Sequence, residues 1–177
     1  MLLMKIAGAV CITAATTLYA RGLVLELSTR LEALKFLKQS FYALKGELRY
    51  GVETLPTAFM NVGERCGVGG EDIRNFFWNM GRRLGSDDTV SLKEVWEEEA
   101  KALAARVNLD GRECDSLVRV SESLGYLDIT QQVSNIDLYL ESIEADIAAL
   151  TEKYADNCRM YMGLGVMAGL FLTIILI

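Results

Sequence analysis

Residues 129–159 read ITQQVSNIDLYLESIEADIAALTEKYADNCR. Apolar side chains recur through this stretch at spacings that alternate between three and four residues: Val133, Ile136, Leu140, Ile143, Ile147, Leu150 and Tyr154. This period is typical of a helix that buries one narrow apolar seam against a second helix. The stretch therefore predicts a long helical arm over residues 129–158 and an all-α fold around it.

A second arm is predicted over residues 26–50, where apolar residues are again spaced by threes and fours. They are Leu27, Leu31, Leu34, Leu37, Phe41, Leu44 and Leu48. Residues 21–50 carry six basic and three acidic groups, net +3, whereas residues 128–159 carry two basic and seven acidic groups, net −5. The buried seams would supply most of the stability, and the opposite charges would select the partner. We expect the two arms to pair antiparallel.

Residues 51–128 predict a cap of shorter helices between the arms. Three helix starts carry N-terminal signals, which are Thr54 with Pro56, Ser91 with Glu94, and Asp110 with Glu113. Four aromatic residues are predicted to form the core of the cap: Phe76, Phe77, Trp78 and Trp96. The segment CGVGGED at 66–72 follows no predicted strand and lacks the Gly-Lys-Ser/Thr ending of a phosphate loop, so it predicts a turn between helices.

The last eighteen residues, 160–177, contain no charged group. A helix of that length spans about 27 Å, close to the ~30 Å hydrocarbon thickness of a bilayer. Arg159 and Tyr161 stand where interfacial residues are found. This end predicts a C-terminal transmembrane helix over 160–177, in preference to a buried or monotopic helix.

Residues 1–25 form a second apolar end, with fifteen uncharged residues between Lys5 and Arg21. If Arg21 extends toward the headgroups, the stretch reaches Leu25 and is long enough to span. The alternative is a cleaved signal peptide, although no A-x-A site follows. We favour a retained N-terminal transmembrane segment.

Lysines and arginines near these ends lie almost entirely between them, in residues 21–159. The positive-inside bias therefore predicts a cytoplasmic central domain, 26–158, with both termini across the membrane. Small residues four apart would let the spans approach each other closely in lipid. These predicted packing positions are Ala7, Cys11 and Ala15 in one span, and Gly165 and Gly169 in the other.

Composition argues against several function classes. The chain has no histidine, and its four cysteines form no closely spaced pair, so we predict neither a zinc site nor general-base catalysis. Glu97, Glu98 and Glu99 would point in different directions on a helix, which argues against a cation site. A net charge of −6 argues against nucleic acid as a partner. We predict no enzymatic activity, no cofactor and no small-molecule substrate.

Three segments in order carry a family resemblance: LKGELRYGVETLPTAF, ESLGYLDITQQVSNIDL and KYADNCRMYMGLGVMAGLFLTIILI. With the length and the two apolar ends, they resemble stage III sporulation protein AB of endospore-forming Firmicutes. The resemblance implies a membrane protein of the mother cell, within a secretion-like channel complex that joins mother cell and forespore. The family is similar in helical architecture to platform proteins of type II secretion. That similarity implies docking of the complex's ATPase, stage III sporulation protein AA.

The sequence thus predicts a membrane-anchored adaptor with lipid and other stage III proteins as partners, and leaves a homo-oligomer open. We place the partner contact at the two turns between arms and cap: Glu47, Tyr50, Gly51, Leu55, Pro56, Gly125, Asp128 and Gln132. The alternative function is a small pore-forming or holin-like hairpin. Its N-terminal span would use the polar residues Thr13, Thr16 and Thr17.

Overall fold

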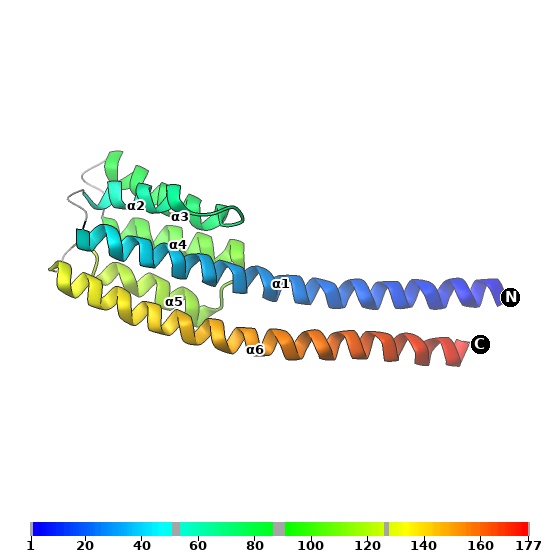
Figure 1. Ribbon diagram of the computed structural model, residues 1–177. Helices are drawn as coiled ribbons and strands as arrows, with labels where there is room; N and C mark the ends of the chain where they lie inside the picture. Colours follow the sequence, from blue (N-terminus) through cyan, green and yellow to red (C-terminus); the bar gives the residue numbers. More distant parts are fainter. Residues whose placement is uncertain (1, 51–53, 87–90, 126–127, 177) are drawn as a thin grey trace. The chain divides into compact units, whose positions relative to one another are not determined.

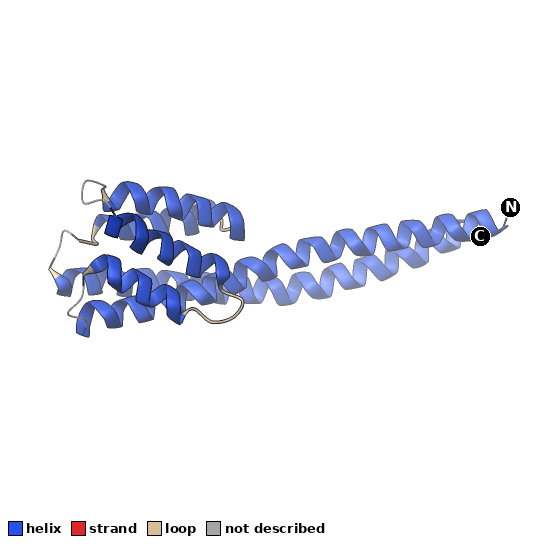
Figure 2. Cartoon of the chain, turned by 90° about the horizontal axis from the view of Figure 1, so that it is seen from above, coloured by secondary structure: helices blue, strands red, loops and turns tan. Residues whose placement is uncertain are grey.

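The computed structural model describes residues 2–50, 54–86, 91–125 and 128–176, and among the side chains before Leu25 and after Asp156 only those of Leu18, Met160 and Met167. Its elements are α1 (Leu2–Tyr50), α2 (Leu55–Arg65), α3 (Glu71–Ser86), α4 (Leu92–Val107), α5 (Gly111–Arg119), the 3₁₀ turn η1 (Val120–Glu122) and α6 (Ile129–Leu176) (Figure 1). No strand occurs in these described ranges (Figure 2). The predicted all-α class is confirmed.

The chain divides into two units, Arg30–Ala148 and a second unit made of Met1–Thr29 with Ala149–Ile177. The first unit holds α2 to α5 and the inner parts of α1 and α6. The second unit holds the outer parts of α1 and α6, which each continue as helix from one unit into the other. The predicted division at residues 26 and 158 stays a prediction.

Within the unit Arg30–Ala148, α1 and α6 pair antiparallel, as predicted. Lys38 forms an ion pair with Glu144 at 2.8 Å, and Lys45 forms one with Asp137. Residues later in α1 therefore pair with residues earlier in α6. The seam residues between them are buried: Leu31, Leu34, Leu37, Phe41, Leu44, Val133, Ile136, Leu140 and Ile143. The opposite charges of the two arms thus lie on either side of a shared apolar seam.

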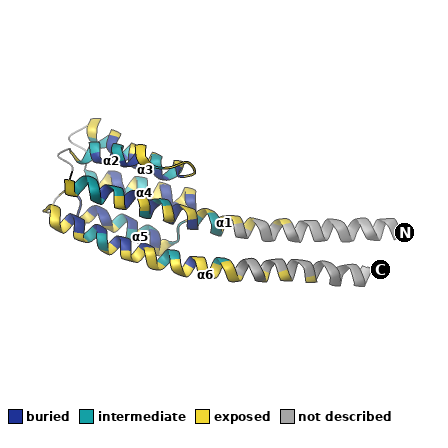
Figure 3. Cartoon of the chain, in the orientation of Figure 1, coloured by how far each residue is buried: buried dark blue, intermediate teal, exposed yellow. Residues whose placement is uncertain are grey.

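An aromatic cluster forms the centre of this unit, and buried residues line the inner faces of its helices (Figure 3). Phe41 of α1 contacts Trp96 of α4 and Tyr139 of α6, with ring centroids 6.1 and 4.5 Å apart. The Trp96 indole, fully buried, donates a hydrogen bond to the Leu117 carbonyl at 2.8 Å. The prediction that Trp78 belongs to this core is wrong. It is 42% exposed, because it covers Gly63 at the surface of α2 instead of facing inward.

Two glycines let α2 and α3 approach closely and run antiparallel. A Cβ added at Gly81 would lie 2.7 Å from the Pro56 carbonyl, and one at Gly63 would lie 3.2 Å from the Arg74 carbonyl. Real Cβ atoms essentially never come as near as 2.7 Å. Glycine at position 81 is therefore a requirement of this helix pair.

The helix-start signals have mixed outcomes. Asp110 and Glu113 form the predicted capping box, with both reciprocal bonds at 2.9 Å. Ser91 is the N-cap of α4, but its side chain makes no capping bond, so the capping box predicted there with Glu94 is wrong. Thr54 likewise starts α2 without a side-chain cap, because its hydroxyl pairs with that of Thr57.

The loop at 66–70 joins α2 to α3, which confirms the predicted turn. Three of its residues, Gly67, Gly69 and Gly70, lie against the ring of Phe36 from α1. Gly69 has a φ of +95°, a conformation that L side chains rarely adopt. At its tip Val68 is 96% exposed.

No helix in the described part of the chain is long and apolar enough to cross a membrane. The predicted spans, 1–25 and 160–177, fall mostly on residues whose side chains lie outside that part. The same holds for the five predicted packing positions Ala7, Cys11, Ala15, Gly165 and Gly169.

Candidate partner-binding surfaces

The structure brings the two predicted turns together at one end of the unit Arg30–Ala148 (Figure 1). A Cβ at Gly125 would lie 3.6 Å from Leu55 Cδ1, in ordinary contact. Gly125 has a φ of +82°, which favours glycine at the exit from η1. We call the described residues of these turns the turn surface: Glu47, Tyr50, Leu55, Pro56, Gly125, Asp128 and Gln132. The predicted Gly51 lies outside the described residues.

Glu47 is engaged within the fold. Its carboxylate accepts from Arg65 at 2.8 Å and from Asn61 at 3.4 Å, both on α2, and its side chain is only 12% exposed. These bonds hold the end of α1 against α2. Glu47 therefore has a structural role that the sequence did not predict.

Asp128, Pro56 and Gln132 also serve the fold. The Asp128 side chain accepts the Thr130 backbone N–H at 3.2 Å, and its carbonyl accepts those of Gln131 and Gln132, so it caps α6. Pro56 stands in the first turn of α2, and Gln132 is buried.

Tyr50 is the residue of the turn surface most available to a partner, with 82% of its surface exposed. It lies beside a shallow cavity of about 340 Å³ that Gly46, Glu47 and Arg65 also line. An exposed aromatic beside a cationic side chain is the residue combination that protein interfaces favour.

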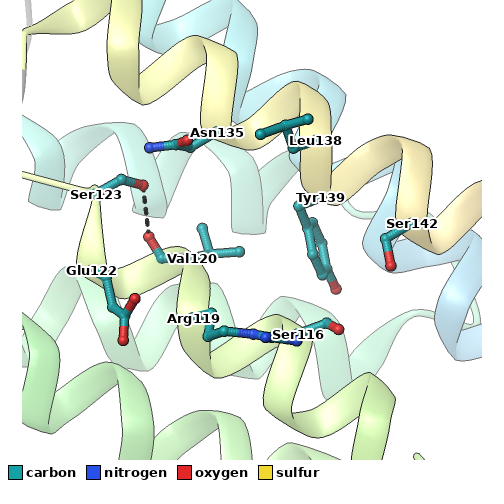
Figure 4. Close-up of a pocket in the computed structure, with 9 residues that line it drawn as sticks. All are labelled: Ser116, Arg119, Val120, Glu122, Ser123, Asn135, Leu138, Tyr139 and Ser142. Atoms are coloured by element: carbon teal, nitrogen blue, oxygen red, sulfur yellow. Dashed lines mark hydrogen bonds between the residues drawn. The ribbon is translucent and has the colours of Figure 1, made fainter.

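A second surface was not predicted from the sequence. Between α5–η1 and α6 lies a groove of about 480 Å³, drawn in Figure 4. We call it the α5–α6 groove and define it by its lining residues: Ser116, Arg119, Val120, Glu122, Ser123, Asn135, Leu138, Tyr139 and Ser142. Its walls are 12 or more residues apart in sequence and belong to different elements. No single motif could therefore reveal it, although the exposed Leu138 on an otherwise polar face of α6 is a signal in the sequence.

Ionic groups elsewhere in this unit are matched with one another. Arg30 donates to Glu113 at 2.8 Å and to Asp110 at 2.6 Å. The hydrogen bond to Glu113 raises the pKa of Arg30, against the effect of burial. Glu98 and Glu99 both accept from Arg83, and Glu97 accepts from Lys101. In the described part of the chain, no three Cys, Asp or Glu residues gather to hold a metal ion.

Comparison with known proteins decides the family. The sequence model of stage III sporulation protein AB matches residues 5–177. The chain belongs to the stage III sporulation protein AB family. A relative of that name from Bacillus subtilis (strain 168) is 29% identical over 176 residues, which cover 98% of this chain and 99% of the relative. The resemblance inferred from the three sequence segments is thereby confirmed, and the role of the chain lies in sporulation.

A solved structure of stage III sporulation protein AB shares the fold. It superposes with a TM-score of 0.63 at 24% identity and covers 72% of this chain and 97% of its own. At that identity the likeness establishes the fold alone. The AB-family relatives bear the name of a sporulation protein, not of an enzyme. Membership of the AB family also implies other sporulation proteins as partners, which makes the two surfaces above candidates for their contacts.

Proposed function

We propose that the chain is a non-enzymatic, membrane-anchored adaptor of the stage III sporulation complex, and that its helical unit docks the complex's ATPase. The observation that supports docking most directly is Tyr50, an 82% exposed aromatic at the junction of α1 and the cap. The bonds of Glu47 to α2 hold the backbone beneath it, so Tyr50 is presented from a fixed helix end. A rigid aromatic anchor loses little conformational entropy on binding.

Replacing Tyr50 with alanine tests this contact. We expect binding of the purified ATPase to weaken about tenfold or more, the effect of losing one interfacial hot spot. Spore yield should fall with it when the variant replaces the chain in its host. The matched control is Val68→Ala, which truncates an even more exposed apolar side chain in the α2–α3 loop. Full ATPase binding and normal spore yield with Tyr50→Ala would show that the turn surface is not the docking site.

The proposed anchors are the segments 1–25 and 160–177, and the proposed location is the mother-cell membrane around the forespore with residues 26–158 in the cytoplasm. The uncharged run of eighteen residues at the C-terminus supports this proposal. Four large apolar side chains of the unit that contains both ends are exposed in the isolated chain, namely Leu18, Leu25, Met160 and Met167. Contact with lipid would remove this surface from water.

Anchoring predicts how the chain behaves on extraction. Washing membranes with alkaline carbonate releases peripheral proteins but leaves spanning helices in the bilayer. We expect the full chain to remain in the membrane pellet after this treatment, and only detergent to release it. Recovery in the carbonate supernatant, together with a peripheral marker protein, would refute the anchor and leave the family assignment untouched.

A further inference from the structure

The α5–α6 groove contains a hydroxyl that bonds no described protein group. Tyr139 is 93% buried, and its ring packs on Phe41. In the described part of the chain its hydroxyl makes no hydrogen bond, and the oxygen itself keeps accessible surface, so it opens into the groove. Figure 4 shows the ring descending from α6 toward Ser116 of α5. A hydroxyl that opens into a groove and has no protein partner is a position where a ligand group can take the place of water.

Other polar groups line the same groove. Figure 4 places Ser116 and Arg119 on the α5 side and Asn135 and Ser142 on the α6 side. Ser123 differs from them because its hydroxyl is already bonded to the Val120 carbonyl. The groove therefore offers donors and acceptors along two helices, with Leu138 as an apolar contact on the rim. Such a surface suits the peptide groups of a polypeptide segment.

The open shape of the groove favours a polypeptide segment over a small molecule as its occupant. Binding sites for small ligands enclose about 70–90% of the ligand surface. Here Arg119, Glu122 and Ser142 are exposed, and Leu138 is 61% exposed, so the groove is open along its length. An open groove between two helices is the usual site for a segment of another protein.

The acidic surroundings of the groove favour one sign of charge in that segment. Residues 111–148 carry two basic and eight acidic groups, net −6, which equals the net charge of the whole chain. Three of the acidic groups are neutralised by α1: Glu113 by Arg30, Asp137 by Lys45 and Glu144 by Lys38. In the described part of the chain Glu122 and Glu141 make no ion pair and can meet a cation. Arg119, which also lines the groove, is likewise without an ion pair, so the negative sign comes from the acidic residues around the groove and not from the net charge of its lining. A basic segment would therefore be attracted, and an acidic one repelled.

Protonation keeps the Tyr139 hydroxyl a donor. Burial, reinforced by the negative charges of Glu113 and Asp146, raises the pKa of Tyr139 above its ordinary value. At physiological pH the hydroxyl can therefore donate to a carbonyl of the bound segment.

We propose that the α5–α6 groove binds a basic, Lys- or Arg-bearing segment of a partner protein, with the Tyr139 hydroxyl donating to that segment and Glu122 meeting its positive charge. This inference rests on the proposed adaptor function but assigns it a second contact, separate from the turn surface. It goes beyond ATPase docking at Tyr50 because it fixes the chemistry of the partner.

Photocrosslinking in sporulating cells of the natural host tests the proposal with the full chain. The photoreactive residue p-benzoylphenylalanine replaces Leu138 on the groove rim or, as a control for position, the exposed Ala102 on α4. We expect Leu138 to crosslink to a defined segment of another protein, and mass spectrometry to show that this segment has a net positive charge. Ala102 should not crosslink to it.

Two variants in the Leu138 crosslinking background test the chemistry. Tyr139→Phe removes only the hydroxyl and keeps the ring packed on Phe41, and Glu122→Arg reverses one charge. We expect each to reduce the crosslink about tenfold. Glu64→Arg on α2 makes the same charge change outside the groove, because Glu64 is exposed and makes no ion pair in the described ranges. It should leave the crosslink unchanged.

Several outcomes would overturn the groove proposal. The first is that position 138 gives no crosslink, or crosslinks to lipid or to a second copy of the chain. The second is that the crosslinked segment is neutral or acidic. The third is that the crosslink forms in full yield in both groove variants. If any of these occurs while Tyr50→Ala still weakens ATPase binding as expected, the adaptor function stands and only the groove inference falls. If ATPase binding also survives Tyr50→Ala, both fail.

Discussion

Replacing Arg30 with alanine is expected to lower the free energy of unfolding by about 3 kcal/mol, because breaking a buried ion pair from one side leaves its partner uncompensated. The Arg30 guanidinium donates to both oxygens of Glu113, whose side chain is only 4% exposed, and to Asp110. These two acids form the capping box of α5. A single side chain of α1 thus fixes the start of a helix 80 residues away.

Denaturant unfolding of the full chain in detergent, followed by tryptophan fluorescence, to which the buried Trp96 contributes, measures this loss. Lys101→Ala is the control, since it removes an equally short but exposed pair with Glu97 and should change little. Replacing both partners, with Arg30→Met and Glu113→Gln together, should recover part of the lost stability, because no buried charge then remains. Equal losses for Arg30→Ala and Lys101→Ala would mean that the cluster contributes no more than a surface pair.

Gly81→Ala should destabilise the protein by about 1–3 kcal/mol, the usual cost of overpacking. The added methyl would collide with Met60 Cγ and stand 2.7 Å from the Pro56 carbonyl. Met60 can turn away, but the carbonyl belongs to the first turn of α2 and moves only if the helix moves. The α2–α3 contact would therefore have to open.

Gly85→Ala provides the matched control on the same helix. Its Cβ would meet only Pro56 Cβ, at 3.7 Å, an ordinary contact. Because alanine favours helix over glycine by up to ~1 kcal/mol, this change should leave stability unchanged or raise it. The two substitutions should therefore shift the urea midpoint in opposite directions. A shift of the same sign and size for both would show that α2 and α3 are not closely packed at Gly81.

Periodic patterns made the long elements predictable. The alternation of threes and fours over Val133–Leu150 reports one buried face, and the structure buries five of these six residues, all but Ile147, which is half-buried. Likewise, the opposite charges of the arms predicted the pairing that Lys38 and Lys45 make with α6. Both signals repeat over many turns of a helix. The prediction therefore still holds when one position departs from the pattern.

Single-residue signals were less reliable because their outcome depends on partners far away in sequence. Asp110 with Glu113 and Ser91 with Glu94 have the same spacing, yet only the first pair forms a capping box. Trp78 is aromatic like Phe77 and follows it directly in the chain. It nevertheless lies on the outer side of α3 and packs over Gly63.

The candidate surfaces show the same division. Tyr50 was found because it adjoins a turn that the sequence marks with glycine and proline. The engagement of Glu47 by Arg65 and the whole α5–α6 groove arise only when helices meet. The sequence could therefore predict where helices end, but it could not predict a groove that forms between the faces of two helices.

The glycines that cover Phe36 have a consequence for how this family can diverge. A side chain at position 70 would need the room that the Phe36 ring occupies, since its Cβ would stand 2.8 Å from Phe36 Cδ1. The two positions therefore constrain each other across 34 residues, and in lineages that lose one we expect the other to be replaced as well. Val68, which lies between Gly67 and Gly69 in the loop and is 96% exposed, can change independently.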